Sequence, residues 1–279
     1  MRGRGLTGWM FLLAAGYLAY QSISEQSPAP PAPNQTPTQA APPGHAPRQV
    51  AGEKLRSGGY ALRAESTWPP LTAGQDQQPA KDLLAVNYYV VLDGSGSMNE
   101  RNCAAGQTKM DAARKALASF AQSVPAGANL GLAVFENRGL MELLPLGTGN
   151  REQFGQAVRQ VVAGGGTPLS TAVQLAYERL LAQGRAQLGY GEYHLVVVTD
   201  GLASDGYDPT PKVNEILNSS PVMLHTIGFC IGTQHSLNQP GRTFYQAADN
   251  PEALRQGLDA VLAESPSFDL ANFRDRLGP

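Results

Sequence analysis

The chain has 279 residues, with 21 basic and 23 acidic side chains and a formal net charge of −2. This near balance gives no overall attraction to polyanions, so we expect no nucleic-acid partner. The length is sufficient for one sizeable hydrophobic core together with additional segments.

The first segment has the pattern of an export signal. Arg2 and Arg4 precede an apolar stretch without charged residues that extends from Gly5 to Ser24. Its length is close to the about 20 residues that a membrane-spanning helix needs. The pattern fits either a signal peptide over residues 1–25 that is cleaved after export, or a retained anchor in the inner or plasma membrane formed by residues 6–23. Both alternatives place the rest of the chain in the cell envelope, on the periplasmic or extracellular face.

Residues 26–81 are expected to form a linker and a segment next to the folded domain. The part from Ser27 to Pro47 is rich in Pro, Ala, Gln and Thr and has almost no large apolar side chain. Such a composition cannot form a core and favours an extended, polyproline-like spacer. The remainder is polar and interrupted by Gly and Pro, with a short strand expected around Tyr60–Arg63.

From residue 82 to residue 264, strand patterns alternate with helical patterns. Strands are expected at residues 83–93, 129–136, 140–144, 193–200, 221–230 and 243–247, the third as a short edge strand. Helices are expected at residues 108–124, 150–162, 170–183, 211–218 and 251–264. This alternation predicts an α/β fold with a doubly wound, mostly parallel sheet flanked by helices. Residues 265–279 remain as a tail to which the sequence assigns no role.

Three oxygen-rich motifs follow predicted strands or glycines. Asp93 ends the first strand and is followed by Ser95 and Ser97, Thr167 follows three glycines, and Asp200 ends the strand "YHLVVVTD". In doubly wound sheets, ligands bind beyond the carboxyl ends of the strands, where the strand order reverses. Ligands that are all oxygen suit a hard divalent cation, namely Mg²⁺, Ca²⁺ or Mn²⁺, and such an ion would relieve the repulsion between the two carboxylates.

These motifs resemble those of a von Willebrand factor type A domain. The resemblance covers residues 82–264 and rests on Asp-x-Ser-x-Ser at residues 93–97, the threonine after glycines, and Thr-Asp-Gly at residues 199–201. It implies a Rossmann-like domain with an intact metal-ion-dependent adhesion site (MIDAS). In that site Ser95 and Ser97 bind the metal through their hydroxyls, and Thr167 binds it directly or through water. The two aspartates, Asp93 and Asp200, act mainly through bound waters, or one of them binds the metal directly.

The resemblance also implies a function. A partner protein would supply an Asp or Glu side chain as the last metal ligand, so the domain would act in adhesion or protein–protein interaction, with Mg²⁺ as the metal expected first. The alternative is a non-enzymatic accessory or scaffold subunit of a larger assembly, for example with an ATPase partner, in which the metal site is structural or inert.

The sequence gives little support for a catalytic serine or a phosphate-binding loop. Ser95 and Ser97 are not part of a G-x-S-x-G motif, no histidine falls within the three motifs, and phosphate-binding glycine motifs are missing from this region. We therefore expect no enzyme, no catalytic residue and no small-molecule substrate. The resemblance places Cys103 and Cys230 near the metal edge, where they would form a disulfide in an exported protein; two free thiols are the alternative.

Overall fold

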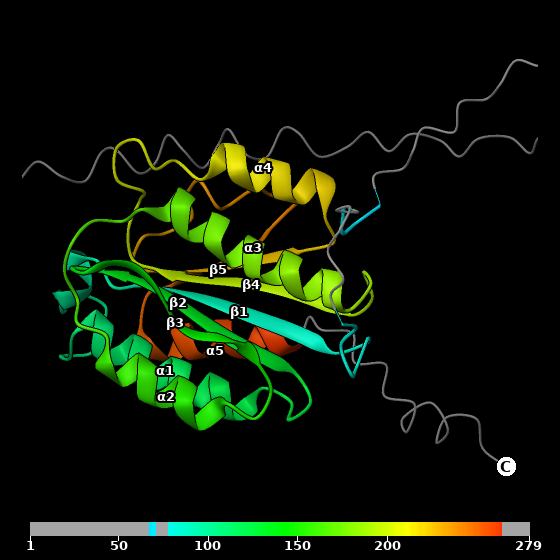
Figure 1. Ribbon diagram of the computed structural model, residues 1–279. Coiled ribbons are helices and arrows are strands. Elements are labelled where there is room, and N and C mark those ends of the chain that lie inside the picture. The colour runs from blue at the N-terminus through cyan, green and yellow to red at the C-terminus, as the bar shows by residue number, and fades with distance from the viewer. Residues whose placement is uncertain (1–66, 71–77, 264–279) are drawn as a thin grey trace, which may run out of the picture. The chain divides into compact units, whose positions relative to one another are not determined.

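The structure is a computed structural model that describes residues 67–70 and 78–263 (Figure 1). The predicted export segment, the spacer, the strand around Tyr60–Arg63 and the tail lie outside these residues. No helix within the described part of the chain is long and apolar enough to cross a membrane.

A six-stranded sheet with the order β3-β2-β1-β4-β5-β6 forms the centre of the domain. Its strands are β1 (Val86–Asp93), β2 (Asn129–Glu136), β3 (Gly139–Gly147), β4 (Glu192–Thr199), β5 (Met223–Phe229) and β6 (Phe244–Ala248). All neighbouring strands are parallel except β2 and β3, which pair antiparallel. The chain builds the sheet outward from β1 to β3 and then, after a crossover, from β4 to β6. The strand order therefore reverses between β1 and β4, where a ligand site is expected.

Helices cover both faces of the sheet, which confirms the predicted fold class (Figure 1). The helices are α1 (Lys109–Ser123), α2 (Arg151–Gln160), α3 (Leu169–Ala186), α4 (Thr210–Ser219) and α5 (Pro251–Ala263). One hydrophobic core joins α1, α2 and α5 to the sheet, and a second core joins α3 and α4 to its other face. The strand β1 serves both, because Val90 and Leu92 enter the first core whereas Tyr89 and Val91 enter the second.

The boundaries of the elements show where the sequence patterns were ambiguous. The strand β2 has the predicted bounds, whereas β1 begins at Val86 rather than at residue 83, and Leu84 is exposed. The edge strand β3 extends to Gly147, beyond the predicted end at residue 144. A short 3₁₀ helix, Gly96–Asn99, follows β1 and was not predicted, since it contains only one buried apolar side chain.

Trp68, which precedes β1 in the chain, packs against α3 and β4. The indole meets the Tyr193 ring edge to face, with centroids 4.6 Å apart. Its Nε1–H donates to the Tyr177 hydroxyl at 3.4 Å. Gly184 in α3 leaves room for the indole, since a Cβ at this position would lie 2.2 Å from the ring. The segment around Trp68 is thus attached to the face covered by α3.

Candidate functional site

The reversal of strand order brings two aspartates to one edge of the sheet. Asp93 is the last residue of β1, and Asp200 follows the last residue of the neighbouring strand β4. The chain turns sharply after β1 at Gly94, whose N–H donates to the carbonyl of Phe135 at 2.8 Å. A Cβ on Gly94 would lie 2.7 Å from the same oxygen, so only glycine fits this close approach.

Hydrogen bonds join four of the five predicted site residues. The Ser95 and Ser97 hydroxyl oxygens lie 3.0 Å apart, and the Ser97 hydroxyl donates to Oδ1 of Asp200 at 2.7 Å. The Ser95 N–H donates to Oδ1 of Asp93 at 2.8 Å. Three of these residues, Asp93, Ser95 and Asp200, are buried. Side-chain oxygens from two separate segments of the chain therefore converge at the switch point.

The fifth predicted residue, Thr167, lies on a glycine loop that packs against the same motif. The Gly96 N–H donates to the carbonyl of Gly165 at 3.1 Å, and the Gly164 N–H donates to that of Gly94 at 2.8 Å. Thr167 is buried, and its N–H donates to the Ser204 hydroxyl at 2.9 Å. The backbone contacts thus bring the loop that carries Thr167 to the serine motif, as the sequence predicted.

Thr199 holds Asp93 from the other side, and the sequence analysis gave it no role of its own. Its hydroxyl donates to Oδ2 of Asp93 at 2.6 Å, so both carboxylate oxygens accept hydrogen bonds. Burial raises the pKa of Asp93 to about 6, opposed by the hydrogen bonds from Ser95 and Thr199 and reinforced by the nearby charge of Asp200. A cation at this edge would favour the ionised form of the carboxyl.

Lys109 is a second participant that the sequence analysis missed. Its side chain is almost fully buried, and its Nζ donates to Oδ2 of Asp200 at 2.9 Å and to Oε2 of Glu100 at 2.8 Å. Burial opposes the charge, but the hydrogen bonds and attraction from the two carboxylates outweigh it and raise the pKa of Lys109. A sequence signal was present: Lys109 is the first residue of α1, and a cation is unfavourable at the positive end of a helix.

The donor chemistry of this edge suits a hard metal ion. Among the described residues there is no group of three or more His, Cys, Asp or Glu side chains that could hold one. The candidate site instead combines two carboxylates with hydroxyl oxygens, the ligand type that Mg²⁺, Ca²⁺ and Mn²⁺ prefer. A cation is already held at Asp200 in the form of the Lys109 ammonium, so the residues present fit a positively charged ligand.

The structure has Cys103 and Cys230 as free thiols, which corresponds to the alternative to the expected disulfide. The two thiols are nonetheless neighbours, and the Cys230 Sγ also lies 3.5 Å from the carbonyl oxygen of Asn102. Burial, together with the hydrogen bond to Cys103, raises the pKa of Cys230 to about 12.

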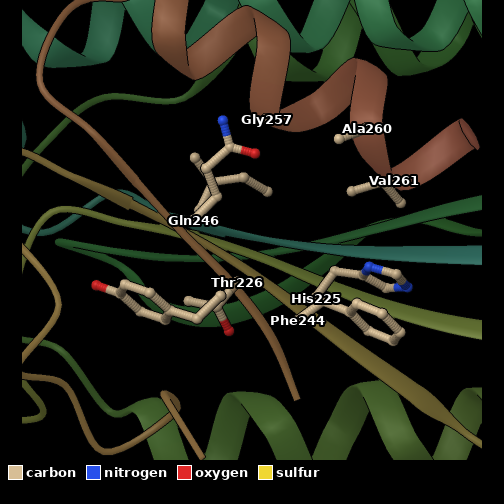
Figure 2. Close-up of a pocket in the computed structure, with 9 residues that line it drawn as sticks. His225, Thr226, Phe244, Gln246, Gly257, Ala260 and Val261 are labelled. Carbon is tan, nitrogen blue, oxygen red and sulfur yellow. The ribbon is translucent and has the colours of Figure 1, made fainter. Parts of the chain in front are cut away.

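A cavity of ≈ 200 Å³ lies elsewhere, between α5 and the strands β5 and β6 (Figure 2). His225 and Phe244 form one wall, and their rings stack with centroids 4.8 Å apart. Gly257 of α5 and Gln246 of β6 lie next to each other at its edge, since a Cβ on Gly257 would lie 3.3 Å from the Gln246 side chain. Burial and the neighbouring His194 lower the pKa of His225 to about 3, so its ring is neutral. The cavity is lined by uncharged side chains and contains none of the predicted site residues.

Comparison with known proteins agrees with the resemblance seen in the sequence. Residues 88–202 match the family described as "von Willebrand factor type A domain". The chain is 26% identical over 179 residues to the uncharacterized protein YwmC of Bacillus subtilis (strain 168), a match that covers 58% of this chain and 74% of YwmC.

Solved structures with the same fold come from diverse organisms. The conserved hypothetical protein BatB from Bacteroides thetaiotaomicron is 16% identical, with a TM-score of 0.50, over 64% of this chain and 100% of that one. The von Willebrand factor domain of the type V pili tip protein Mfa5 from Porphyromonas gingivalis is 13% identical, with a TM-score of 0.51, over 64% and 94%. Manganese-loaded TRAP from Plasmodium vivax is 21% identical, with a TM-score of 0.50, over 64% and 74%. At these identities the likeness concerns the fold.

Proposed function

We propose that the chain, in which residues 88–202 match the von Willebrand factor type A family, is a non-enzymatic interaction module that captures an acidic side chain of a partner protein through a bound divalent cation. The cation is Mg²⁺ in the first instance, with Mn²⁺ and Ca²⁺ as alternatives. It would be held by the five oxygen-bearing residues of the MIDAS: Asp93, Ser95, Ser97, Thr167 and Asp200.

The observation that carries this proposal is the hydrogen-bonded chain from Ser95 through Ser97 to Asp200. Two hydroxyl oxygens and a carboxylate from distant parts of the sequence already lie within hydrogen-bond distance of one another. Asp93 holds the serine loop through the Ser95 N–H and is itself held by Thr199. A bound cation would supply positive charge, and its neutral hydroxyl ligands would leave that charge available for a carboxylate from the partner.

The setting that we propose is the cell envelope, with the domain exported and anchored by residues 6–23. Support comes from the charge pattern of the first 25 residues. Among proteins of the same fold, one is named an aerotolerance-related membrane protein from Bacteroides fragilis and another is a pilus tip protein. Fractionation of cells that express the full chain tests this setting, and recovery in the cytosol would favour the alternative of a subunit in a larger assembly.

The metal is tested by thermal unfolding of the full chain, first in EDTA and then with Mg²⁺, Mn²⁺ or Ca²⁺. An ion present at 100 times its Kd stabilises the folded protein by about 2.7 kcal/mol, so the melting temperature should rise. Asp93→Ala should remove the response, whereas Asp205→Ala, an exposed aspartate in the next loop, should retain it. Equal melting temperatures with chelator and with excess metal would contradict the proposal.

The partner is tested by affinity capture from an envelope extract, with and without EDTA. Proteins that bind through the metal should be lost when the chelator is present, and their loss should be reproduced by Ser97→Ala without chelator. A set of captured proteins that is the same in all three conditions would argue against capture through the ion.

A further inference from the structure

We propose that Lys109 is an internal counter-ion of the adhesion site, which stabilises the site when it holds no metal and weakens metal binding when metal is available. This inference rests on the proposed function, since it concerns the affinity of the same site for its cation. It assigns a role to a residue outside the five oxygen-bearing positions of the motif.

The geometry ties Lys109 directly to the site. Its Nζ contacts Oδ2 of Asp200 at 2.9 Å, while Oδ1 of the same carboxylate accepts the Ser97 hydroxyl at 2.7 Å. The ammonium therefore occupies one of the two oxygens that Asp200 could offer to a metal. The Lys109 side chain is 4% exposed and that of Asp200 is 0% exposed, so water has little access to either charge.

Burial makes a counter-ion necessary when metal is absent. A carboxylate removed from water without a partner is strongly destabilising, and a paired one is not. Asp200 lies close enough to Asp93 for their charges to interact, and both are buried. Without the Lys109 ammonium, this edge of the sheet would contain two buried carboxylates, and no other Lys or Arg of the described residues forms an ion pair with them. Lys109 thus stabilises the folded, metal-free state in which the carboxylates of the site are ionised.

The positive charge of Lys109 also weakens the binding of a metal ion at the same site. Glu100, Asp93, Asp200 and Lys109 together carry a formal charge of −2, from three carboxylates and one ammonium. A divalent ion would neutralise this set, but its charge would repel the ammonium held at Asp200, and the repulsion is strong where water is excluded. The site therefore binds a divalent cation less tightly than it would without the Lys109 ammonium.

A simple positioning role predicts the opposite sign. If Lys109 only orients Asp200 for the metal, its removal should weaken metal binding. If Lys109 is a competing cation, its removal should destabilise the metal-free protein and strengthen metal binding. The two roles are thus separated by the direction in which the Kd changes, which a general loss of structure cannot reproduce.

The experiment compares the full chain with Lys109→Met and with a control on the same helix, Lys115→Met. Met retains the apolar stem of lysine, and Lys115 is exposed and hydrogen-bonded to Gln107. The Kd for MgCl₂ and for MnCl₂ is measured by calorimetry, and the melting temperature is measured in EDTA. We expect Lys109→Met to melt roughly 5 °C lower in EDTA and to bind metal on the order of tenfold more tightly. Lys115→Met should match the wild type in both.

Each outcome of this experiment either supports the proposed role of Lys109 or overturns it. Weaker or unchanged metal binding by Lys109→Met overturns the inference, and so does an unchanged melting temperature in EDTA. A variant that is unfolded in EDTA but folded with Mg²⁺ supports it. If Lys109→Met is unfolded in both conditions, Lys109→Gln, which keeps a hydrogen-bond donor without the charge, is judged by the same criteria.

The same measurements distinguish a failure of the proposed metal-dependent function from a failure of the inference about Lys109. A wild-type chain that binds no metal contradicts the metal-dependent function. In that case the inference about Lys109 is supported if Lys109→Met gains metal binding, and it is overturned if neither protein binds metal.

Discussion

The two ends of β1 and β4 both bury polar side chains, but only one end buries charges. At the carboxyl end, Asp93 and Asp200 lie beside the Lys109 ammonium. At the amino end, Asn87 and His194 are also fully buried, but they are uncharged and hydrogen-bonded to neighbouring strands. The carboxylate at this end, Glu192, is partly exposed and lies 3.3 Å from Nε2 of His194. Buried neutral groups need hydrogen bonds, whereas buried charges also need counter-ions. The charged end is therefore the one suited to respond to a ligand.

The amino end is stabilised by ring stacking across four strands. The rings of Tyr88, His194, His225 and Phe244 follow one another with centroid separations of 4.7, 5.2 and 4.8 Å. Nδ1 of His194 lies 3.0 Å from Nε2 of His225, so one nitrogen of this pair carries the shared proton. Burial lowers the pKa of both histidines, and the pair is neutral in the folded protein. This end of the sheet is a structural network that acid would disrupt.

The largest effect is expected from Asp200→Ala at the charged end. The substitution leaves the buried Lys109 ammonium with Glu100 as its remaining carboxylate partner. Breaking a buried ion pair on one side costs about 3–5 kcal/mol, so the free energy of unfolding in EDTA should fall by this amount. Urea unfolding measures the change. Asp205→Ala, which removes an exposed carboxylate, should cost less than about 0.5 kcal/mol. Similar losses in the two variants would show that the ion pair of Asp200 with Lys109 does not contribute to stability.

A smaller, pH-dependent effect is expected from His225→Gln at the neutral end. The folded-state pKa of His225 is lowered to about 3, below the about 6.5 of an unfolded chain. As the pH falls, the unfolded chain takes up the proton first, so the stability that the neutral ring provides is present above about pH 6.5 and is lost below it. Relative to the variant, the wild type should lose about 2 kcal/mol between about pH 8 and about pH 5.

The comparison with the variant is needed because Asp93 acts in the opposite direction. Its folded-state pKa is raised to about 6, so the folded protein binds a proton more readily and stability falls as the pH rises from about 4 to about 6. This contribution is the same in both proteins and cancels in their difference. A difference that stays flat from pH 8 to pH 5 would show that His225 takes up its proton in the folded protein as readily as in the unfolded chain, and would contradict the lowered pKa.

Thr199→Val should cost about 1–2 kcal/mol, because it leaves Oδ2 of the buried Asp93 without the hydroxyl that donates to it at 2.6 Å. The isosteric substitution keeps the packing of β4. Chemical unfolding in EDTA measures the loss, and Thr199→Ser, which retains the hydroxyl, should recover most of it. If the serine and valine variants are equally stable, the hydrogen bond to Asp93 contributes nothing.

The sequence contained most of the fold because the apolar strands and amphipathic helices have distinct periodicities. It also contained the charged end, because the oxygen-bearing residues follow directly after strands, and strand ends in a parallel sheet share an edge. The sequence pattern could not reveal that Lys109 pairs with Asp200, because the two residues are 91 positions apart in the chain. The stacking of His194 on His225 was equally hidden, since it depends on the register between β4 and β5.

The smallest effect is expected from Thr108→Ala, which lies beside the charged end without belonging to its ion pairs. The Thr108 hydroxyl caps α1 by accepting the Asp111 N–H, and loss of such a cap costs about 1 kcal/mol. Lys109 begins the same helix, so a change in its position would be felt at Asp200. We expect thermal unfolding in EDTA to show the loss while the Kd for Mg²⁺, measured by calorimetry, stays within about twofold of the wild type, because the ammonium is held by its two carboxylates rather than by the cap. A Kd that changes tenfold would mean that the start of α1 tunes the site through its backbone, and the contrast between the two ends of the sheet would then extend beyond their charges.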